Sequence, residues 1–259
     1  MTTSLAPHAS GLDAPPPSTV VPIPFGRLVR VEWAKATDTR ASRWLLAVVA
    51  LWTIGMVAVP VLAPSTFEQT QASYLRVAAL GLTVLLPVVA ILVFTSEWSQ
   101  RSAMTTFTQE PRRLRVLRAK LAVSALLGTG GAAFAAVVAV AGMGAAAASG
   151  RTLAADLSVG VIAGYLLFVL LSTLGGAALG AVLQSSGVAI AASFVLPAIL
   201  AVLGEASTLV ADWLDMSVWG WVLENDWGGH VPQIAFSTVL WIAAPLAAGA
   251  FRTIRRDVG

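Results

Sequence analysis

The sequence contains no cysteine and only two histidines, and both absences limit the chemistry that the chain can perform. Without cysteine there is neither a disulfide framework nor a thiolate ligand for a metal ion, and the redox compartment cannot be inferred. His8 lies in a proline-rich stretch, whereas His230 follows a Gly-Gly pair far along the chain. A histidine-based metal centre or catalytic cluster is therefore disfavoured.

Charged residues are scarce as well. They make up 11% of the 259 residues, whereas 57% of the residues are hydrophobic. Because soluble domains contain about 25% charged residues, this composition, with its mean hydropathy of +0.82, indicates an integral membrane protein. The basic residues lie in short segments between apolar runs, whereas nucleic-acid binding needs a continuous basic surface on a soluble fold. We expect the lipid bilayer as a partner and no nucleic acid.

Motifs for energy-yielding chemistry are also missing. The sequence has no G-x-x-x-x-G-K-[ST] loop for ATP phosphates, no G-x-S-x-G elbow and no H-E-x-x-H pair. Its ionisable residues stop at the boundaries of the apolar runs, whereas proton-coupled or sodium-coupled carriers usually need an ionisable group inside the membrane. We therefore expect no enzymatic activity, no cofactor and no metal in this chain by itself, so that the energy for any transport comes from elsewhere.

Six apolar runs are long enough to cross the roughly 30 Å of hydrocarbon in a bilayer, which takes about 20 helical residues. They cover approximately residues 44–63, 76–95, 120–148, 157–183, 188–210 and 232–251. The predicted fold is an all-α integral membrane protein whose six transmembrane helices form one domain over residues 44–251. Residues 1–24 contain too many prolines for a helix and are expected to form a disordered tail, and residues 252–259 a short C-terminal tail.

Lysine and arginine are distributed unevenly between the two sides of these runs. All but two of the 16 basic residues precede the first run, lie between the second and third, or follow the sixth. Only Arg76 and Arg151 fall on the other side. The positive-inside rule places the basic side in the cytoplasm. We therefore predict a multi-pass protein of the inner (plasma) membrane with both termini in the cytoplasm.

Residues 25–43 are too polar to span but carry an amphipathic pattern. One side of a helical wheel carries Phe25, Leu28, Val29 and Trp33. Arg27 and Arg30 lie opposite, and Glu32 interrupts the apolar side. The pattern favours an interfacial helix along the inner leaflet, with its basic side chains reaching the headgroups. The alternative is a loose basic flank that only orients the first span.

Two further patterns concern helix packing and the outer side. Gly160 and Gly164, and again Gly176 and Gly180, have the small-xxx-small spacing that lets helices approach closely. Residues 204–231 carry a group of tryptophans among acidic residues, namely Trp213, Trp219, Trp221 and Trp227. Tryptophan is typical of the headgroup level, so an aromatic belt is expected there. The alternative is an interfacial or re-entrant segment on the outer face that shapes an exit gate or contacts substrate.

The polar run over residues 96–120 has features that orientation alone does not explain. Glu97 and Arg101 are four residues apart and are predicted to pair on one helical face. Pro111 would end any helix over residues 98–109, and the basic sequence after it is predicted to form a short amphipathic entry helix. The alternative is a plain basic loop that only sets the orientation of the spans.

This run resembles the membrane subunits of type-2 ATP-binding-cassette transporters, especially the small actinobacterial permeases. The residues that carry the resemblance are Glu97, Trp98, Arg101, Thr105, Thr106, Pro111, Arg112, Arg113 and Lys120, together with the upstream R-x-E-x-x-K of Arg30, Glu32 and Lys35. The six-span plan with an interfacial helix is similar to that family over residues 25–256. The long proline-rich tail and the tryptophan-rich outer segment depart from the family and leave the substrate open.

The resemblance implies a permease with an N-terminal connecting helix, and with a coupling helix in its first cytoplasmic loop that docks in a cleft of a separate ATPase. In that family two permease subunits, as a homodimer or a heterodimer, face each other above two ATPases, which bind ATP and magnesium. The resemblance assigns to the ATPase-coupling loop Glu97, Trp98, Arg101, Thr105, Thr106 and Pro111, and to the connecting helix Arg30, Glu32, Trp33 and Lys35. It implies export, by alternating access, of an amphipathic or hydrophobic compound such as an antibiotic, a peptide or a lipid-linked molecule.

Two other functional classes remain open. A membrane scaffold or sensor subunit that transports nothing would have the same composition and would differ in having no ATPase partner. An intramembrane enzyme is a third possibility, although the apolar runs contain no group suited to catalysis. Copurification of a soluble ATPase distinguishes the first two classes.

Overall fold

The computed structural model of the protein describes residues 23–99 and 112–255. Within these ranges the chain is mostly helical and contains no strand. In chain order the first helices are α1 (Phe25–Thr37), α2 (Arg40–Leu62), α3 (Gln71–Ser99), α5 (Arg113–Ala148), α6 (Val159–Leu183) and α7 (Ser186–Ala206), with the 3-10 turn η1 (Pro64–Thr66) after α2. After α7 follow η2 (Val210–Leu214), η3 (Met216–Trp219), α8 (Gly220–Leu223), α9 (Val231–Thr238), η4 (Val239–Ala243) and α10 (Ala244–Arg255).

Six helices among the described residues are long and apolar enough to cross a membrane. They are α2, α3, α5, α6, α7 and the continuous run Val231–Arg255, in which the π-helical turn η4 separates α9 from α10. Each overlaps one of the six apolar runs, so the predicted all-α fold with six such helices is confirmed. These helices make the chain a multi-pass membrane protein.

Local side chains explain where several helices begin and end. The Thr39 hydroxyl accepts the Ser42 N–H at 3.1 Å before α2, and Ser158 caps α6 by accepting the Val161 N–H at 3.2 Å. Such caps satisfy backbone donors that have no partner within the helix. At its other end α6 stops at Gln184, whose φ of 53° lies in the left-handed region. The chain can then turn directly into α7.

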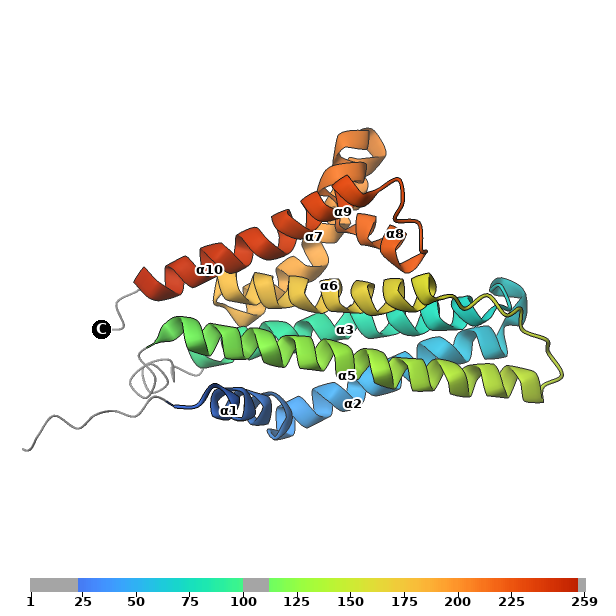
Figure 1. The fold of residues 1–259 in the computed structure, drawn as a ribbon, viewed down its shortest axis with the longest axis horizontal. Helices are drawn as coiled ribbons and strands as arrows, with labels where there is room; N and C mark the ends of the chain where they lie inside the picture. Colours follow the sequence, from blue (N-terminus) through green and yellow to red (C-terminus); the bar gives the residue numbers. More distant parts are fainter. Residues whose placement is uncertain (1–22, 100–111, 256–259) are drawn as a thin grey trace, which may run out of the picture.

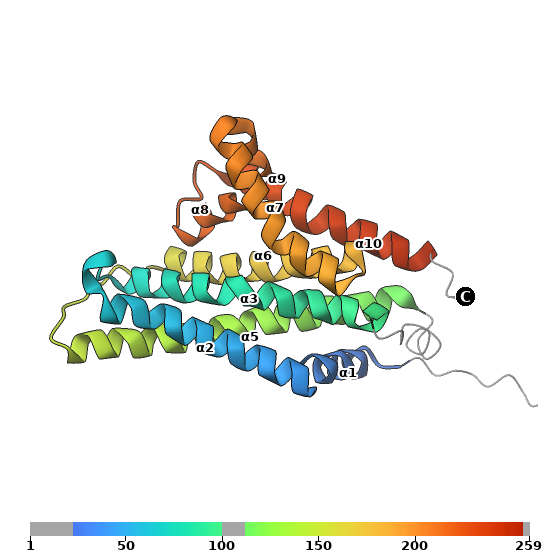
Figure 2. The same ribbon diagram turned by 180° about the vertical axis from the view of Figure 1, so that it is seen from behind.

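The pair α3 and α6 lies at the centre, with α2 and α5 packed on one side and α7 and α10 on the other (Figures 1 and 2). The two central helices approach closely because α6 presents glycines to α3. A Cβ at Gly176 would lie 2.4 Å from the Pro87 carbonyl oxygen, and one at Gly180 would lie 2.9 Å from that of Ile91. The small-xxx-small spacing of Gly176 and Gly180 therefore does mark a helix contact.

The C-terminal helices are far less enclosed than the central pair. Of the apolar window of α3, 67% is buried, compared with 6% of the window of α7. Figure 1 shows α7 leaning away from α6, with α8 lying below its far end. Trp241 in η4 donates from its indole Nε1 to the Leu214 carbonyl oxygen at 2.8 Å, which ties η2 to the last long helix.

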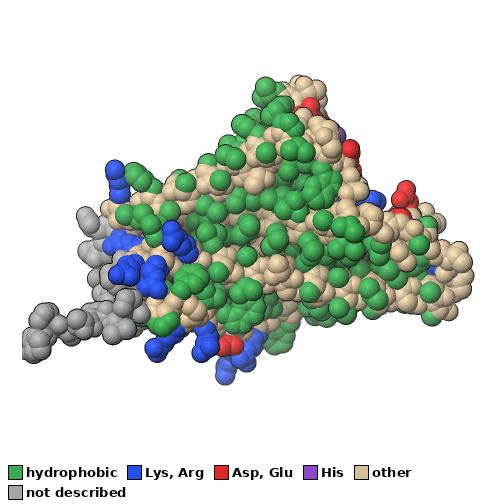
Figure 3. All heavy atoms as spheres, viewed as in Figure 1, with side chains coloured by type: hydrophobic (Ala, Val, Ile, Leu, Met, Phe, Trp, Pro, Cys, Tyr) green, Lys and Arg blue, Asp and Glu red, His purple; other side chains and the backbone are tan. Residues whose placement is uncertain are grey.

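The two ends of the bundle differ in charge (Figure 3). We call the basic end the end that holds α1, the start of α2 and α5, and the ends of α3 and α10. Its described cationic residues are Arg27, Arg30, Lys35, Arg40, Arg43, Arg112, Arg113, Arg115, Arg118, Lys120, Arg252 and Arg255. We call the far end the opposite end, formed by residues 63–70 and 149–158.

Polar side chains close the far end by capping helices. Arg151 donates to the Pro60 and Val61 carbonyl oxygens at 3.2 and 2.6 Å, which satisfies the last turn of α2. Asp156 accepts the Ala72 N–H at the start of α3 at 2.8 Å. Desolvation opposes ionisation of Asp156, but the hydrogen bonds to its carboxylate outweigh this and hold its pKa below the usual 3.8. These residues serve the packing of the bundle.

Candidate functional site

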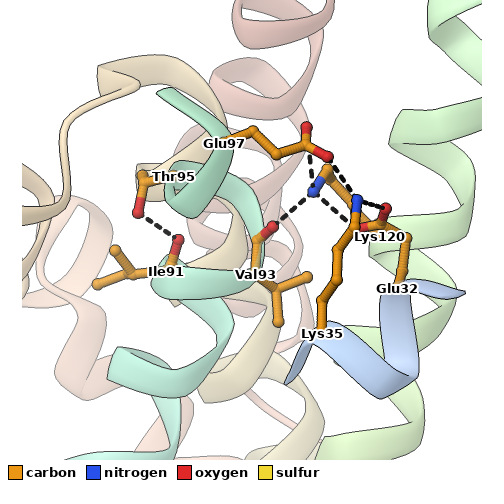
Figure 4. Close-up of polar contacts among 7 residues, drawn as sticks. All are labelled: Glu32, Lys35, Ile91, Val93, Thr95, Glu97 and Lys120. Atoms are coloured by element: carbon orange, nitrogen blue, oxygen red, sulfur yellow. Dashed lines mark hydrogen bonds and ion pairs between the residues drawn. The ribbon is translucent and has the colours of Figure 1, made fainter. Parts of the chain in front are cut away.

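Four charged side chains from three helices meet at the basic end (Figure 4). We call them the charge cluster: Glu32 and Lys35 of α1, Glu97 of α3 and Lys120 of α5. Lys35 Nζ donates to Glu32 Oε1 at 2.6 Å and to Glu97 Oε1 at 2.7 Å. Lys120 Nζ donates to Glu32 Oε2 at 2.7 Å and lies 3.4 Å from Glu97 Oε2. Each ammonium therefore bridges both carboxylates.

Most of the charge cluster is shielded from solvent. Glu32, Glu97 and Lys120 are 4%, 4% and 3% exposed, whereas the side chain of Lys35 is 40% exposed. Lys120 also donates to the Val93 carbonyl oxygen at 2.8 Å, in addition to its hydrogen bond to Glu32 and its ion pair with Glu97. Buried charges are tolerated only with partners of this kind. The cluster thus forms one joint between α1 and the ends of α3 and α5.

The environment of Lys35 favours its charged form. Burial alone would lower its pKa, but the hydrogen bonds and the negative charges of Glu32 and Glu97 outweigh desolvation and raise the pKa of Lys35 above its usual 10.5. Lys35 therefore stays protonated over the physiological range. The four members of the cluster balance as two positive and two negative charges.

Further polar contacts bind other helices together at the basic end. Arg113 at the start of α5 donates to the Thr253 carbonyl oxygen of α10 at 2.6 Å. Gln184 donates to the Thr253 hydroxyl at 3.1 Å, which links the end of α6 to α10. The Thr95 and Ser186 hydroxyls lie 2.7 Å apart and join α3 to α7. These contacts connect the basic ends of α3, α5 and α6 to α7 and α10.

A cleft of about 310 Å³ opens beside the charge cluster, between α1, the start of α2 and the end of α3. Glu32, Lys35 and Glu97 line it together with Ser42 and apolar residues of α3. The cleft gives solvent access to Lys35, whereas Lys120 lies behind it. Among the described residues, no three His, Asp or Glu side chains gather in a way that could hold a metal ion.

The structure brings together some of the predicted site residues and not others. Glu32, Lys35 and Glu97, which were predicted for two separate elements, share the charge cluster. Arg30 and Trp33 of α1 are exposed on other sides of that helix. The side chain of Trp98 lies outside the described residues, and so do the predicted coupling-loop residues Arg101, Thr105, Thr106 and Pro111 with the predicted Glu97–Arg101 pair.

Sequence reasoning missed how Glu32 and Lys120 are used. Glu32 was interpreted as an interruption of the apolar side of α1, yet Glu32 and Ala36 are the residues of α1 that are buried, whereas Phe25 and Trp33 are exposed. Lys120 was assigned to the start of a span without a partner. A lone acid on an apolar helix face, and a lone lysine at the start of an apolar run, were the available signals.

The four tryptophans of the outer segment do not form a simple belt. Trp219 is only 4% exposed, so the belt interpretation is wrong for this residue. The Trp221 ring stacks on His230 with centroids 3.9 Å apart, and Trp213 meets Phe236 edge to face at 5.7 Å. Trp227 donates to Asn225 at 2.9 Å. The segment folds back on α6 and α9 through these contacts.

Comparison with known proteins adds no family assignment: no family model matches the chain, and no curated protein or solved structure is similar to it. The functional argument therefore rests on the residues and their geometry.

Proposed function

We propose that this chain is the permease subunit of a type-2 ATP-binding-cassette transporter, which exports an amphipathic or hydrophobic compound with energy from a separate ATPase. The observation that carries the proposal is the charge cluster. Glu32, Lys35, Glu97 and Lys120 all belong to the pattern that resembles this family, and their side chains form one buried joint. Glu32 and Lys35 belong to the predicted connecting helix, and Glu97 to the predicted coupling loop. Direct contact between their side chains is what a common role of these two elements in coupling requires.

The joint supports transmission of force. The helices α3 and α5 flank residues 100–111, which include Arg101, Thr105, Thr106 and Pro111 of the predicted coupling loop. The cluster holds α1 to both helices. Separating the buried charges is costly because each would lose its partner in a region of low dielectric. A partner that pushed on the loop or on α1 would therefore move the ends of α3 and α5 together. Different contacts in two states of the ATPase would then shift the inward and outward populations of the permease.

The distribution of charge supports the proposed placement. The positive-inside rule assigns the basic end, with both termini, to the cytoplasm, where a soluble ATPase with its ATP and magnesium would bind. The plasma membrane is the corresponding location. The little-buried window of α7 leaves a face for a second permease subunit, identical or different, or for lipid.

Copurification from native membranes tests the proposal. The tagged full-length chain is purified in mild detergent, and ATP hydrolysis is measured in the eluate. We expect the copurified ATPase activity to be lost on deletion of residues 98–109 and strongly reduced by Glu97→Lys, because both changes act on the proposed contact. The matched control is Glu224→Lys, the same change at an exposed residue outside the basic end, which should leave the activity unchanged.

Gel filtration separates loss of the partner from loss of folding, since a folded variant elutes as a single symmetric peak. If no ATPase activity accompanies the wild-type chain and the deletion leaves its behaviour unchanged, the permease proposal fails. The scaffold or sensor function would then be favoured.

A further inference from the structure

A second cavity lies away from the charge cluster, between α3, α6 and α7. This groove has a volume of about 470 Å³ and lies within the size range of small-molecule sites. Gly175 and Gly176 of α6 and Pro87 of α3 line it at the glycine-mediated contact of these two helices. Pro197 and Ser193 of α7 form one wall, and residues 215–220 close one end. We call it the outer groove.

Asp215 places a carboxylate in this largely apolar groove. The residue is only 6% exposed, and no cationic side chain of the described residues forms an ion pair with it. One of its oxygens accepts the Ser217 N–H at 3.0 Å at the start of η3. A single backbone donor compensates a buried carboxylate only partly. The carboxylate can therefore accept a further contact from a cation.

Trp219 supplies a second unused polar group at the same end of the groove. Its indole ring packs on α6, where a Cβ at Gly175 would lie 3.3 Å from the ring. The residue is 4% exposed, and its Nε1 is buried without a hydrogen-bond acceptor. Buried indole N–H groups normally have a partner. Asp215 and Trp219, which both line the groove, thus each carry a buried polar group whose hydrogen bonds are incomplete.

We propose that the outer groove binds an amphipathic organic cation, with its positive group at Asp215, a hydrogen-bond acceptor at the Trp219 N–H and its apolar body along α3, α6 and α7. A hard metal ion such as calcium or magnesium does not suit the groove because it needs about six oxygen ligands. A face of an indole also attracts an organic cation. This inference rests on the proposed function, to which it adds the chemical class of the transported compound.

Two probes of similar size and opposite charge test the charge requirement. Binding of tetraphenylphosphonium and of tetraphenylborate to the full-length protein in lipid nanodiscs is measured by equilibrium dialysis, with empty nanodiscs as the blank. We expect the cation, and not the anion, to bind above the blank. Asp215→Asn should weaken binding of the cation about tenfold, whereas Asp212→Asn, a change at an acid outside the groove, should not affect it.

A neutral probe tests the role of Trp219. Triphenylphosphine oxide carries a strong hydrogen-bond acceptor and no net charge. Trp219→Phe should weaken its binding about fivefold by removing the N–H, whereas Asp215→Asn should leave it unchanged. Asn can still cap η3. Ser193→Leu, a change in the α7 wall, should block binding of both the cation and the oxide without altering Asp215 or Trp219.

The result that overturns the inference is equal binding of cation and anion, or cation binding that Asp215→Asn or Ser193→Leu leaves intact. If Trp219→Phe binds the oxide as tightly as the unmodified protein does, the indole N–H does not donate a hydrogen bond to the ligand. These measurements need no ATPase. If the protein binds the cation as expected but copurifies with no ATPase, the outer groove stands as a binding site and the permease proposal fails. If an ATPase copurifies but the cation does not bind, the permease proposal stands and the binding inference fails.

Discussion

The charge cluster and the outer groove both bury carboxylates, but only the carboxylates of the charge cluster have cationic partners. Glu32 and Glu97 each contact two lysine ammonium groups. Asp215 has one backbone donor and no cationic side chain among the residues that the structure describes. Charges that satisfy one another stabilise an arrangement of helices, whereas a charge without a counterion favours binding of a ligand. The first region is therefore a joint, and the second a site.

The largest expected effect comes from removing the most buried cation of the joint. Lys120→Met leaves Glu32 and Glu97 buried with only the partly exposed Lys35 between them. We expect a loss of about 3 kcal/mol in the free energy of unfolding, the usual result of breaking a buried ion pair. Unfolding of the purified protein by SDS titration measures it. The matched control is Arg118→Met, at an exposed residue two positions away, which should change stability little.

A double variant shows whether the loss comes from unpaired charge. Adding Glu32→Leu to Lys120→Met removes one negative and one positive charge and leaves the pair of Lys35 and Glu97. We expect most of the stability to return, since apolar replacement of a buried pair is often close to neutral. If the two losses simply add, the side chains do not act as one joint.

The same chemical change at both sites gives the sharpest contrast. Glu97→Gln should destabilise the protein by about 2 kcal/mol, because two charge-assisted contacts are lost. Asp215→Asn should leave the free energy of unfolding within about 0.5 kcal/mol, because no ion pair is broken and the cap of η3 remains. Both are measured as above, in the absence of any cationic ligand. An Asp215→Asn loss as large as that of Glu97→Gln would make Asp215 a structural residue.

The glycine-mediated contact of α6 with α3 that lines the outer groove is expected to be rigid. Gly176→Ala would place a Cβ against the Pro87 backbone, and overpacking of this kind costs about 2 kcal/mol. Gly144→Ala in α5, where a Cβ meets nothing within 4 Å, should be neutral or stabilise by up to about 1 kcal/mol. Thermal unfolding followed by tryptophan fluorescence compares the two. Equal midpoints would show that α3 and α6 can separate at this point.

The smallest expected effect is on the pH dependence of stability. The charge cluster should contribute to it at alkaline pH and the far end at acidic pH. The pKa of Lys35 is raised when the protein is folded, so its contribution is complete below 10.5 and is lost as the pH rises through the folded value. Solvent screening limits that contribution to less than about 1 kcal/mol. The pKa of Asp156 is lowered, so its contribution is present above 3.8 and is lost as the pH falls through the folded value.

Lys35→Met should therefore flatten the alkaline side of the stability profile, and Asp156→Asn should flatten the acidic side. Thermal midpoints measured across the pH range provide the test. An alkaline loss that persists in Lys35→Met would assign it to other groups.

The transmembrane helices could be predicted from sequence because the signal is local. About 20 apolar residues in succession cross a bilayer whatever their neighbours are, and small residues four apart mark a close contact. The spacing identified Gly176 and Gly180 on α6 but not their partner, α3. Which helix packs against these two glycines depends on contacts between residues that are distant in sequence.

The two buried sites could not be predicted for the same reason. The Lys35–Glu97 contact joins residues 62 positions apart, and the Lys120–Glu32 contact joins residues 88 positions apart. A helical wheel reports only the residues of one helix, so Glu32 looked misplaced until α3 and α5 supplied its partners. Likewise, a tryptophan near the membrane surface suggests the headgroups, whereas Trp219 lies inside because Gly175 of α6 leaves room for its ring.

The two lysines of the charge cluster differ in exposure, so that one side of the cluster is open to solvent and the other is buried. Lys35 is within reach of dissolved ions through the cleft, whereas Lys120, with a side chain 4% exposed, is not. Mobile ions screen exposed charges over about 8 Å at physiological ionic strength and buried ones much less. High salt should consequently loosen the hold of α1 on α3 while the attachment of α1 to α5 stays firm, so that the helix would swing about Lys120 as a hinge.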